Sequence, residues 1–249
     1  FFKKYTDIFA VIHFAAFKVM NESVNNPLAY YDNNLNSLLN ILKEMNANKI
    51  YNIVFSSSCS VYGRPKETPV SEDAPIQIPS SPYGNTKQIC EEIIADLVKV
   101  SKIKAINLRY FNPAGAHNSA LIGELPIGVP TNLIPFITQT AVGLHKYLKV
   151  YGNDYKTPDG TAIRDYIHVV DVAKAHVIAV ERMINEKIRK GVETFNLGMG
   201  VGHSVLEVIN TFEKVSGQKL NYKYVDRREG DVDRIWADSR LSNKVLCWE

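Results

Sequence analysis

Three continuous apolar segments separated by amphipathic segments constrain the fold of this sequence most. Residues 8–15, 51–58 and 105–111 read IFAVIHFA, YNIVFSSS and AINLRYF, the near-continuous hydrophobicity of strands buried on both faces. After Asn26 and again after Pro82, apolar residues recur every three or four positions, which is typical of helices. Strands that alternate with helices form a parallel sheet covered on both faces. We therefore predict an α/β fold with a Rossmann-like, doubly wound parallel sheet.

The remainder of the chain predicts a second, smaller lobe. Residues 113 to 165 are rich in Gly, Pro and Asn, which is typical of loops and short elements. Later segments predict helices at 170–186 and 204–215 and one more sheet strand at 194–198. We predict a sheet domain and a smaller, discontinuous α/β lobe, divided as follows: 1–112 sheet domain, 113–166 lobe, 167–202 return to the sheet, and 203–249 lobe.

Composition narrows the classes of partner. The 249 residues are 45% hydrophobic and carry 29 basic against 26 acidic side chains, with no clustered basic stripe, so we expect no nucleic-acid partner. The longest apolar run is too short to span a bilayer, so no membrane partner is expected. Three cysteines without a close pair indicate a reducing compartment, and we predict the cytoplasm. The six histidines are scattered, which predicts no metal site.

The segment SPYGNTK at residues 81–87 is the strongest local signal for chemistry. Ser81 and Pro82 suit the start of a helix, and Tyr83 and Lys87 then share its apolar face. An ammonium one turn from a phenol favours the phenolate, as does the positive end of the helix dipole, so we expect Tyr83 to have a lowered pKa and to act as a general base. Spacing alone favours a simpler interpretation, a core tyrosine beside a lysine that reaches out to solvent.

Three serines, Ser56, Ser57 and Ser58, end the second predicted strand. Ligands of open α/β sheets bind beyond the carboxyl ends of the strands, where these hydroxyls are available to a ligand and to Tyr83. A polar turn after a strand is the alternative interpretation. No G-x-S-x-G surrounds these serines, which argues against a serine hydrolase.

Taken together, these residues resemble the Ser–Tyr–Lys triad of short-chain dehydrogenases/reductases, and an ordered set of segments resembles the UDP-glucose 4-epimerase family within them. The resemblance covers nearly the whole chain. Its segments are HFAAFK (13–18), YYDNN (30–34), SSSCSVYG (56–63), SPYGNTK (81–87), LRYFNPAGAH (108–117), RDYIHVVDVA (164–173), NLGMGVGHSV (196–205) and RREGD (227–231).

The resemblance implies an NAD-dependent epimerase that oxidises a UDP-sugar at C4, turns the 4-keto sugar and reduces its other face. It assigns Tyr83 as the base, Ser58 as the partner of the sugar 4-oxygen, and Lys87 to the nicotinamide ribose. The implied NAD contacts are Phe14, Ala15, Ala16 (where the family usually has glycine), Lys18, Asn33, Ser56, Tyr83, Lys87 and Phe111. The implied UDP-sugar contacts are Lys18, Ser58, Tyr83, Asn112, Asn132, Leu133, Tyr151, Arg164, Arg228, Asp231 and Ile235. A homodimer through the helices at 26–46 and 82–100 is also implied.

Several alternatives stay open at this point. A nucleotide-sugar 4,6-dehydratase would carry Asp-Glu where this chain has Cys59 and Ser60. A UDP-N-acetylglucosamine 4-epimerase and a non-catalytic UDP-sugar-binding fragment are the others. Without the resemblance, the charged residues late in the chain are interpreted as members of surface ion pairs: Arg164, Asp165, Arg227, Arg228 and Asp231.

The resemblance also predicts that part of the cofactor site is missing from these residues. The first apolar strand matches the fourth strand of the family, so we expect a partial chain that lacks the glycine-rich turn for the NAD pyrophosphate. Gly198, Gly200 and Gly202 follow a strand, but His203 breaks the G-x-G-x-x-G pattern, so we do not interpret them as that turn.

Overall fold

A parallel four-stranded sheet lies at the centre of the computed structural model, which describes residues 1–188 and 191–248. Its order is β1-β2-β3-β8, and every neighbouring pair is parallel. The strands are Val11–His13, Asn52–Ser58, Lys104–Tyr110 and Val192–Leu197. The predicted α/β class is confirmed. Residues 189 and 190 of the predicted return segment, and residue 249, lie outside the described residues.

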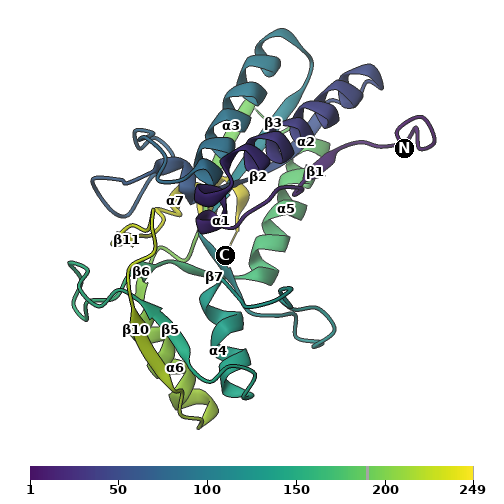
Figure 1. Cartoon of the computed structure of the whole chain (residues 1–249). Coiled ribbons are helices and arrows are strands. Elements are labelled where there is room, and N and C mark those ends of the chain that lie inside the picture. The colour runs from purple at the N-terminus through teal and green to yellow at the C-terminus, as the bar shows by residue number, and fades with distance from the viewer. Residues whose placement is uncertain (189–190, 249) are drawn as a thin grey trace.

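Helices cover both faces of this sheet (Figure 1). On one face lie α2 (Pro27–Ala47) and α3 (Pro82–Val100), whose buried Leu38, Met45 and Ile94 pack against strand residues such as Ile53. On the other face α5 (Val169–Ile184) and α7 (Arg240–Leu246) share a second core with β3 and β8. The sheet is therefore doubly wound, as its apolar strands predict.

Local capping explains where the helices start. Ser81 accepts a hydrogen bond from the Gly84 N–H at 3.2 Å, and Pro82 takes the first position of α3, as predicted. Pro27 begins α2 in the same way, but Asn26 makes no side-chain cap bond. In α6 (Val205–Ser216), Ser204 and Glu207 cap each other reciprocally.

Two short helices near the site were not predicted. They are α1 (Met20–Asn25) and the 3-10 helix η1 (Cys59–Tyr62), which follows Ser58 directly. The strand predicted at 8–15 is also shorter than expected. Only Val11–His13 is paired, because β1 has β2 on one edge and no strand on the other edge within the described residues. Phe9, Ile12 and Phe14 are accordingly about half exposed.

A second group of elements is built from two distant parts of the chain. Strand β5 (Leu148–Tyr151) pairs with β10 (Tyr222–Val225). Strand β6 (Ile163–Arg164) lies between β9 (His203–Ser204) and β11 (Arg234–Ile235). Helix α4 (Leu133–Ala141) packs with α6 in a separate core, and β4 (Asn112–Ala114) pairs with β7 (Tyr166–His168).

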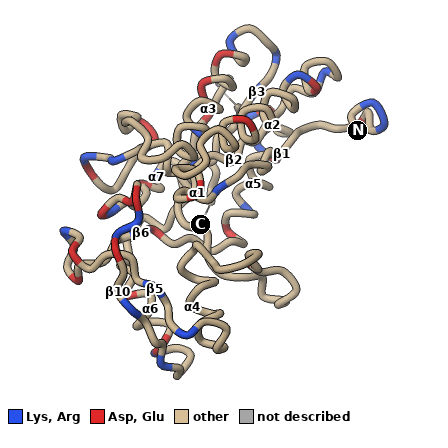
Figure 2. The backbone as a smooth tube through the Cα atoms, viewed as in Figure 1, with Lys and Arg blue, Asp and Glu red and all other residues tan. Residues whose placement is uncertain are grey.

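The division into domains stays a prediction. Residues 240–248 were placed in the substrate lobe, yet Leu246 and Trp248 pack in the core beneath the main sheet. Figure 2 shows basic and acidic residues interspersed over both groups of elements. No helix in the described part of the chain is both long enough and apolar enough to cross a membrane.

Candidate active site

A cavity of about 860 Å³ opens beyond the carboxyl ends of β2 and β3. Its wall is formed by the end of β2, the start of α3, β4, the start of α4, β5, β6 and the segment before β11. Every residue predicted to bind the UDP-sugar lines this cavity: Lys18, Ser58, Tyr83, Asn112, Asn132, Leu133, Tyr151, Arg164, Arg228, Asp231 and Ile235. The fold therefore gathers side chains that are up to 217 positions apart, from Lys18 to Ile235, around one space.

Ser58, Tyr83 and Lys87 lie where α3 begins to pack on β2. Lys87 is 5% exposed, and its Nζ donates to the Ser56 carbonyl at 2.7 Å and lies 6.0 Å from the Tyr83 ring centroid. The Ser60 N–H donates to Ser58 Oγ at 3.2 Å, which fixes the side chain of Ser58. An ammonium with one protein acceptor keeps two N–H groups for a ligand.

Burial controls the acid–base character of this group. It raises the pKa of the Tyr83 phenol, with Tyr110 adding to the shift and Ser58 opposing it. It also lowers the pKa of Lys87 to about 8. The prediction of a lowered phenol pKa is wrong for the protein alone. The cost of burying a phenolate exceeds the attraction of an ammonium that the Ser56 carbonyl holds.

The cavity wall also carries guanidinium groups. Arg228 lies over the ring of Tyr151 at 3.9 Å from its centroid, and no ion pair holds it among the described residues. Arg164 NH2 is 3.3 Å from Asp231 Oδ1. A guanidinium that is stacked on an aromatic ring and has no carboxylate partner suits the diphosphate of a nucleotide.

Lys18 and Asn132 meet at a carboxylate that was not predicted. Glu124 Oε1 accepts from Lys18 Nζ at 3.3 Å and from Asn132 Nδ2 at 2.6 Å, and it also lines the cavity. This carboxylate orients both donors while leaving each with further N–H groups.

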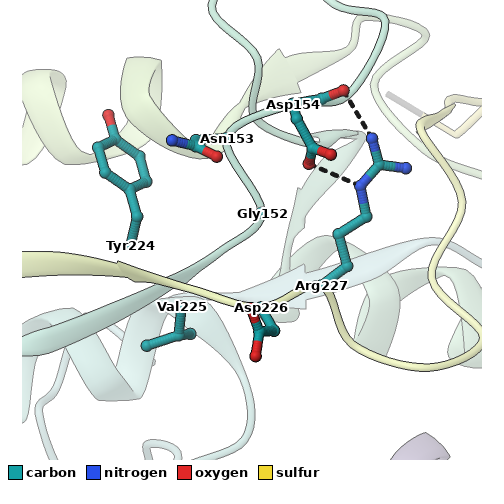
Figure 3. Close-up of a pocket in the computed structure, with 7 residues that line it drawn as sticks. All are labelled: Gly152, Asn153, Asp154, Tyr224, Val225, Asp226 and Arg227. Atoms are coloured by element: carbon teal, nitrogen blue, oxygen red, sulfur yellow. Dashed lines mark hydrogen bonds and ion pairs between the residues drawn. The ribbon is translucent and has the colours of Figure 1, made fainter.

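The neighbouring Arg227 faces away from this cavity. Its Nε donates to Asp154 Oδ1 at 2.7 Å and its NH2 to the Asp154 carbonyl at 2.6 Å, beside a small surface pocket at the ends of β5 and β10 (Figure 3). Two adjacent arginines therefore have different environments. The interpretation as a surface ion pair holds for Arg227.

That interpretation is wrong for Asp165, which is fully buried. Its carboxylate accepts the N–H groups of Met199 at 2.8 Å, Gly200 at 3.1 Å and Ala237 at 3.0 Å. A Cβ at Gly198 would overlap this carboxylate. Gly198 thus leaves room for Asp165, whereas Gly202 leaves room for Ile163 and Trp236.

Of the remaining predicted cofactor residues, Phe111 lines the cavity and the others lie outside its wall. Ser56 and Lys87 are buried, and Phe14 is 55% exposed and packs against the His176 ring with centroids 4.5 Å apart. Ala15 is exposed, and Ala16 and Asn33 are half-buried. The structure brings these residues to the carboxyl ends of β1 and β2, but their assignment to NAD stays a prediction.

The residues present fit the nicotinamide half of NAD. Lys87 has spare N–H groups and Phe14 offers an exposed ring. For the pyrophosphate, residues 1–188 and 191–248 hold no glycine-rich turn between a strand and a helix at the start of the sheet.

The sequence interpretation missed Asn34, which organises this region. Its side chain accepts from the Phe17 N–H at 2.7 Å and donates to the Phe17 carbonyl and to Thr86 Oγ1 on α3, at 3.1 and 3.0 Å. A polar residue on the apolar stripe of α2 was the available signal, because such a residue is buried only with partners.

Comparisons with known proteins decide the family. The family model described as GDP-mannose 4,6 dehydratase matches residues 2–249. UDP-glucose 4-epimerase of Drosophila melanogaster is 50% identical over 96% of this chain and 68% of its own length. The human UDP-glucose 4-epimerase is 48% identical over 99% of this chain and 70% of its own length. This chain belongs to the UDP-glucose 4-epimerase family.

Solved structures of this family share its fold. That of the Bifidobacterium longum UDP-glucose 4-epimerase in complex with NAD⁺ and UDP has a TM-score of 0.93 and 48% identity, covering 98% of this chain and 72% of that one. The Brucella ovis UDP-glucose 4-epimerase in complex with NAD has a TM-score of 0.91 and 40% identity, covering 100% and 74%. The chain therefore spans about 70% of the length of these epimerases.

Proposed function

We propose that this chain interconverts UDP-glucose and UDP-galactose with NAD as cofactor. The observation that supports the proposal is that every predicted UDP-sugar residue, Ser58, Tyr83 and Arg228 among them, lines one cavity, with Lys87 buried one helical turn from Tyr83. Epimerase relatives at 48–50% identity support the same reaction.

Each residue has a distinct part in the proposed reaction. Arg228 and Arg164 hold the diphosphate, and Ser58 donates to or accepts from the sugar 4-oxygen. Tyr83 takes the proton of the 4-hydroxyl and later returns it, while Lys87 binds a ribose hydroxyl and supplies positive charge near the phenol. When bound, NAD supplies the hydride acceptor and then the hydride donor, together with a positive charge that favours an ionised phenol. A sugar bound in this cavity displaces water from the space around its C4.

The dehydratase alternative lacks an acid and a base at positions 59 and 60, where that family carries Asp-Glu. Burial raises the pKa of the Cys59 thiol to about 12, so this thiol stays protonated at neutral pH. Its neighbour Ser60 carries a hydroxyl that does not ionise near neutral pH. Elimination of water across C5–C6 requires a proton acceptor at this position, and the described residues provide none there.

A proton NMR assay tests the proposed function. UDP-galactose incubated with the chain and an excess of NAD should yield the anomeric signal of UDP-glucose. Arg228→Ala should weaken the binding of UDP in calorimetry by about tenfold or more, since a guanidinium–phosphate contact is lost, while Arg227→Ala is the matched control on the outer surface. Equal effects of the two substitutions would contradict the placement of the diphosphate.

The range of UDP-sugars that the site accepts is expected to depend on Ile235, which is 4% exposed and lines the cavity. The resemblance implies that family members with a tyrosine at this position accept only UDP-glucose and UDP-galactose. Members with a small residue there also accept the N-acetylated UDP-sugars. A branched aliphatic side chain is intermediate in size, so we expect good activity on UDP-glucose and UDP-galactose and weak activity on UDP-N-acetylglucosamine. Overlap with an acetamido group is costly in a packed wall.

Two substitutions measure this effect. Ile235→Tyr should abolish the activity on UDP-N-acetylglucosamine and spare that on UDP-glucose, whereas Ile235→Cys should raise the former. The measurement is the ratio of kcat/KM for the two substrates. An identical ratio in the wild type and in both variants would show that Ile235 does not control substrate specificity.

We expect residues 1–249 alone to bind NAD more weakly than micromolar. Lys87 and Tyr83 are present for the nicotinamide end, but the described residues contain no turn of N–H groups for the pyrophosphate. Calorimetry with NAD measures this affinity. Micromolar binding would show that another segment holds the pyrophosphate.

Two further properties belong to the same proposal. A homodimer through α2 and α3, which lie side by side (Figure 1), is supported by exposed apolar residues at their ends, Leu28 and Val100. A cytoplasmic location is supported by three free cysteines. Sedimentation analysis and cell fractionation test these two statements.

A further inference from the structure

A buried ion pair lies directly behind the Ser58–Tyr83–Lys87 group and has no part in the reaction as proposed. Arg109 on β3 donates to both carboxylate oxygens of Glu91 on α3, from Nε at 3.0 Å and from NH2 at 2.6 Å. The two side chains are 9% and 12% exposed. Bidentate pairs of this kind fix geometry as well as charge.

Glu91 completes a row of contacts between α3 and β2. Tyr83, Lys87 and Glu91 are spaced by four residues, so they lie on one face of the helix. Lys87 Nζ donates to the Ser56 carbonyl at 2.7 Å, and Ser57 Oγ donates to Glu91 Oε1. Ser57 immediately precedes Ser58. The position of Ser58 relative to Tyr83 is therefore tied to these two contacts.

Arg109 connects the same row to the elements that follow β2. Its NH1 donates to Tyr62 Oη at 3.0 Å, at the end of η1, and to the Glu72 carbonyl at 3.4 Å. Tyr62 Oη in turn donates to Asn196 Oδ1 on β8 at 2.7 Å. One charged network thus joins β2, η1, α3, β3 and β8 behind the cavity wall.

A buried ion pair is not the most stabilising solution for such a position. Removing two charges from water is costly, and apolar residues of similar volume often stabilise a core as well or better. Ion pairs in cores are best attested where they specify one arrangement among several. The network is therefore better explained by geometry than by stability.

We propose that Glu91, held by Arg109, is a positioning residue that fixes Ser58 and Tyr83 relative to each other. The functional part of this statement rests on the function proposed above. Glu91 does not line the cavity. It acts through Ser57 on the strand and through its own helix, on which it shares a face with Tyr83 and Lys87.

The charges around Glu91 determine what its removal does. Arg109 faces it from β3, with Tyr62 and Glu72 around that guanidinium, and Lys87 and Cys90 lie on its own helix. Lys87 itself also faces His13 of β1, whose pKa is lowered to about 4 by burial and by this ammonium, so His13 is neutral near pH 8. Burial lowers the pKa of Lys87 to about 8, and Cys90 and Glu91 oppose that shift. Glu91→Gln removes a negative charge and leaves Arg109 uncompensated. Both changes disfavour the Lys87 ammonium, so its pKa should fall further.

The test is an NMR titration of the Lys87 side chain, assigned with Lys87→Arg, in the wild-type chain, Glu91→Gln and Glu92→Gln. Glu92 is exposed on the same helix, so its substitution makes the same chemical change outside the network. We expect the pKa of Lys87 to fall by roughly one unit in Glu91→Gln and to stay unchanged in Glu92→Gln. An unchanged pKa in Glu91→Gln would overturn the proposal.

Steady-state kinetics test whether Glu91 positions Ser58 and Tyr83. With NAD in excess, Glu91→Gln should lower kcat by about 10–100-fold with little change in KM. As the pH rises, the activity of this variant should be lost at a lower pH than the activity of the wild type. If Glu91→Gln does not fold, Glu91→Asp keeps the charge but withdraws the carboxylate from Ser57, and it should lower kcat while the Lys87 pKa is retained. Wild-type kcat in a folded Glu91 variant would contradict positioning. Absence of epimerisation in the wild type would instead refute the proposed function, and the titration would still decide the role of Glu91.

Discussion

Replacing Tyr83 with phenylalanine is expected to lower the rate of epimerisation by about 10²–10⁴-fold, the usual contribution of a general base. The phenol lies in the cavity wall beside Ser58, with Lys87 one turn further along α3. Phenylalanine keeps the ring and its packing but has no oxygen to exchange a proton with the sugar. The fold should therefore be retained, and the loss should fall on kcat. The measurement is steady-state conversion of UDP-galactose with NAD in excess, accompanied by thermal unfolding.

Tyr166→Phe is the matched control, because Tyr166 also contributes a phenol to this cavity. Its substitution removes the same atom at another place in the wall and should leave kcat within a few-fold of the wild type. Turnover near the wild-type rate in Tyr83→Phe, or equal losses in both variants, would refute Tyr83 as the base.

The largest expected effect on stability comes from Asp165→Ala, which should lower the free energy of unfolding by about 3–5 kcal/mol. The Asp165 carboxylate is fully buried and accepts the N–H groups of Met199, Gly200 and Ala237. Alanine leaves these three donors without an acceptor in the interior. Because Ala237 follows β11, the wall that carries Ile235 should loosen as well.

Denaturant unfolding measures this change, with Asp226→Ala as the control. Asp226 is an exposed aspartate at the end of β10 (Figure 3), and its removal should change stability by less than about 0.5 kcal/mol. A loss below about 1 kcal/mol for Asp165→Ala would show that water replaces the carboxylate.

The periodicity of the sequence was sufficient to predict the main sheet and the helices α2, α3 and α5, but not α7, which also packs on this sheet. Helix α3 begins and ends at the predicted residues, since Ser81 and Pro82 are strong start signals. The length of strand β1 was overestimated, because a continuous apolar run does not show where a neighbouring strand is available for pairing. Helix α1 has no side-chain cap and only six residues, so its pattern is too short to detect.

Motif order predicted that Arg228 and Ile235 share a site with Ser58, and all three line one cavity. No local pattern in the sequence brings them together, and their roles in binding stay predictions. Burial could not be read from spacing, so the direction of the Tyr83 pKa shift was predicted wrongly. The partners of Asp165 and Arg109 are equally invisible in sequence, because they join strands that are distant along the chain.

Conversion of UDP-galactose that carries deuterium at C4 distinguishes epimerisation from the other possible reactions. With NAD in excess, we expect UDP-glucose of unchanged mass with the deuterium still at C4, because the hydride that leaves C4 returns to C4 while the sugar stays bound. A product that has lost the mass of one water would show a dehydratase. No conversion, with UDP bound and NAD saturating, would contradict the assignment of this chain as a UDP-glucose 4-epimerase.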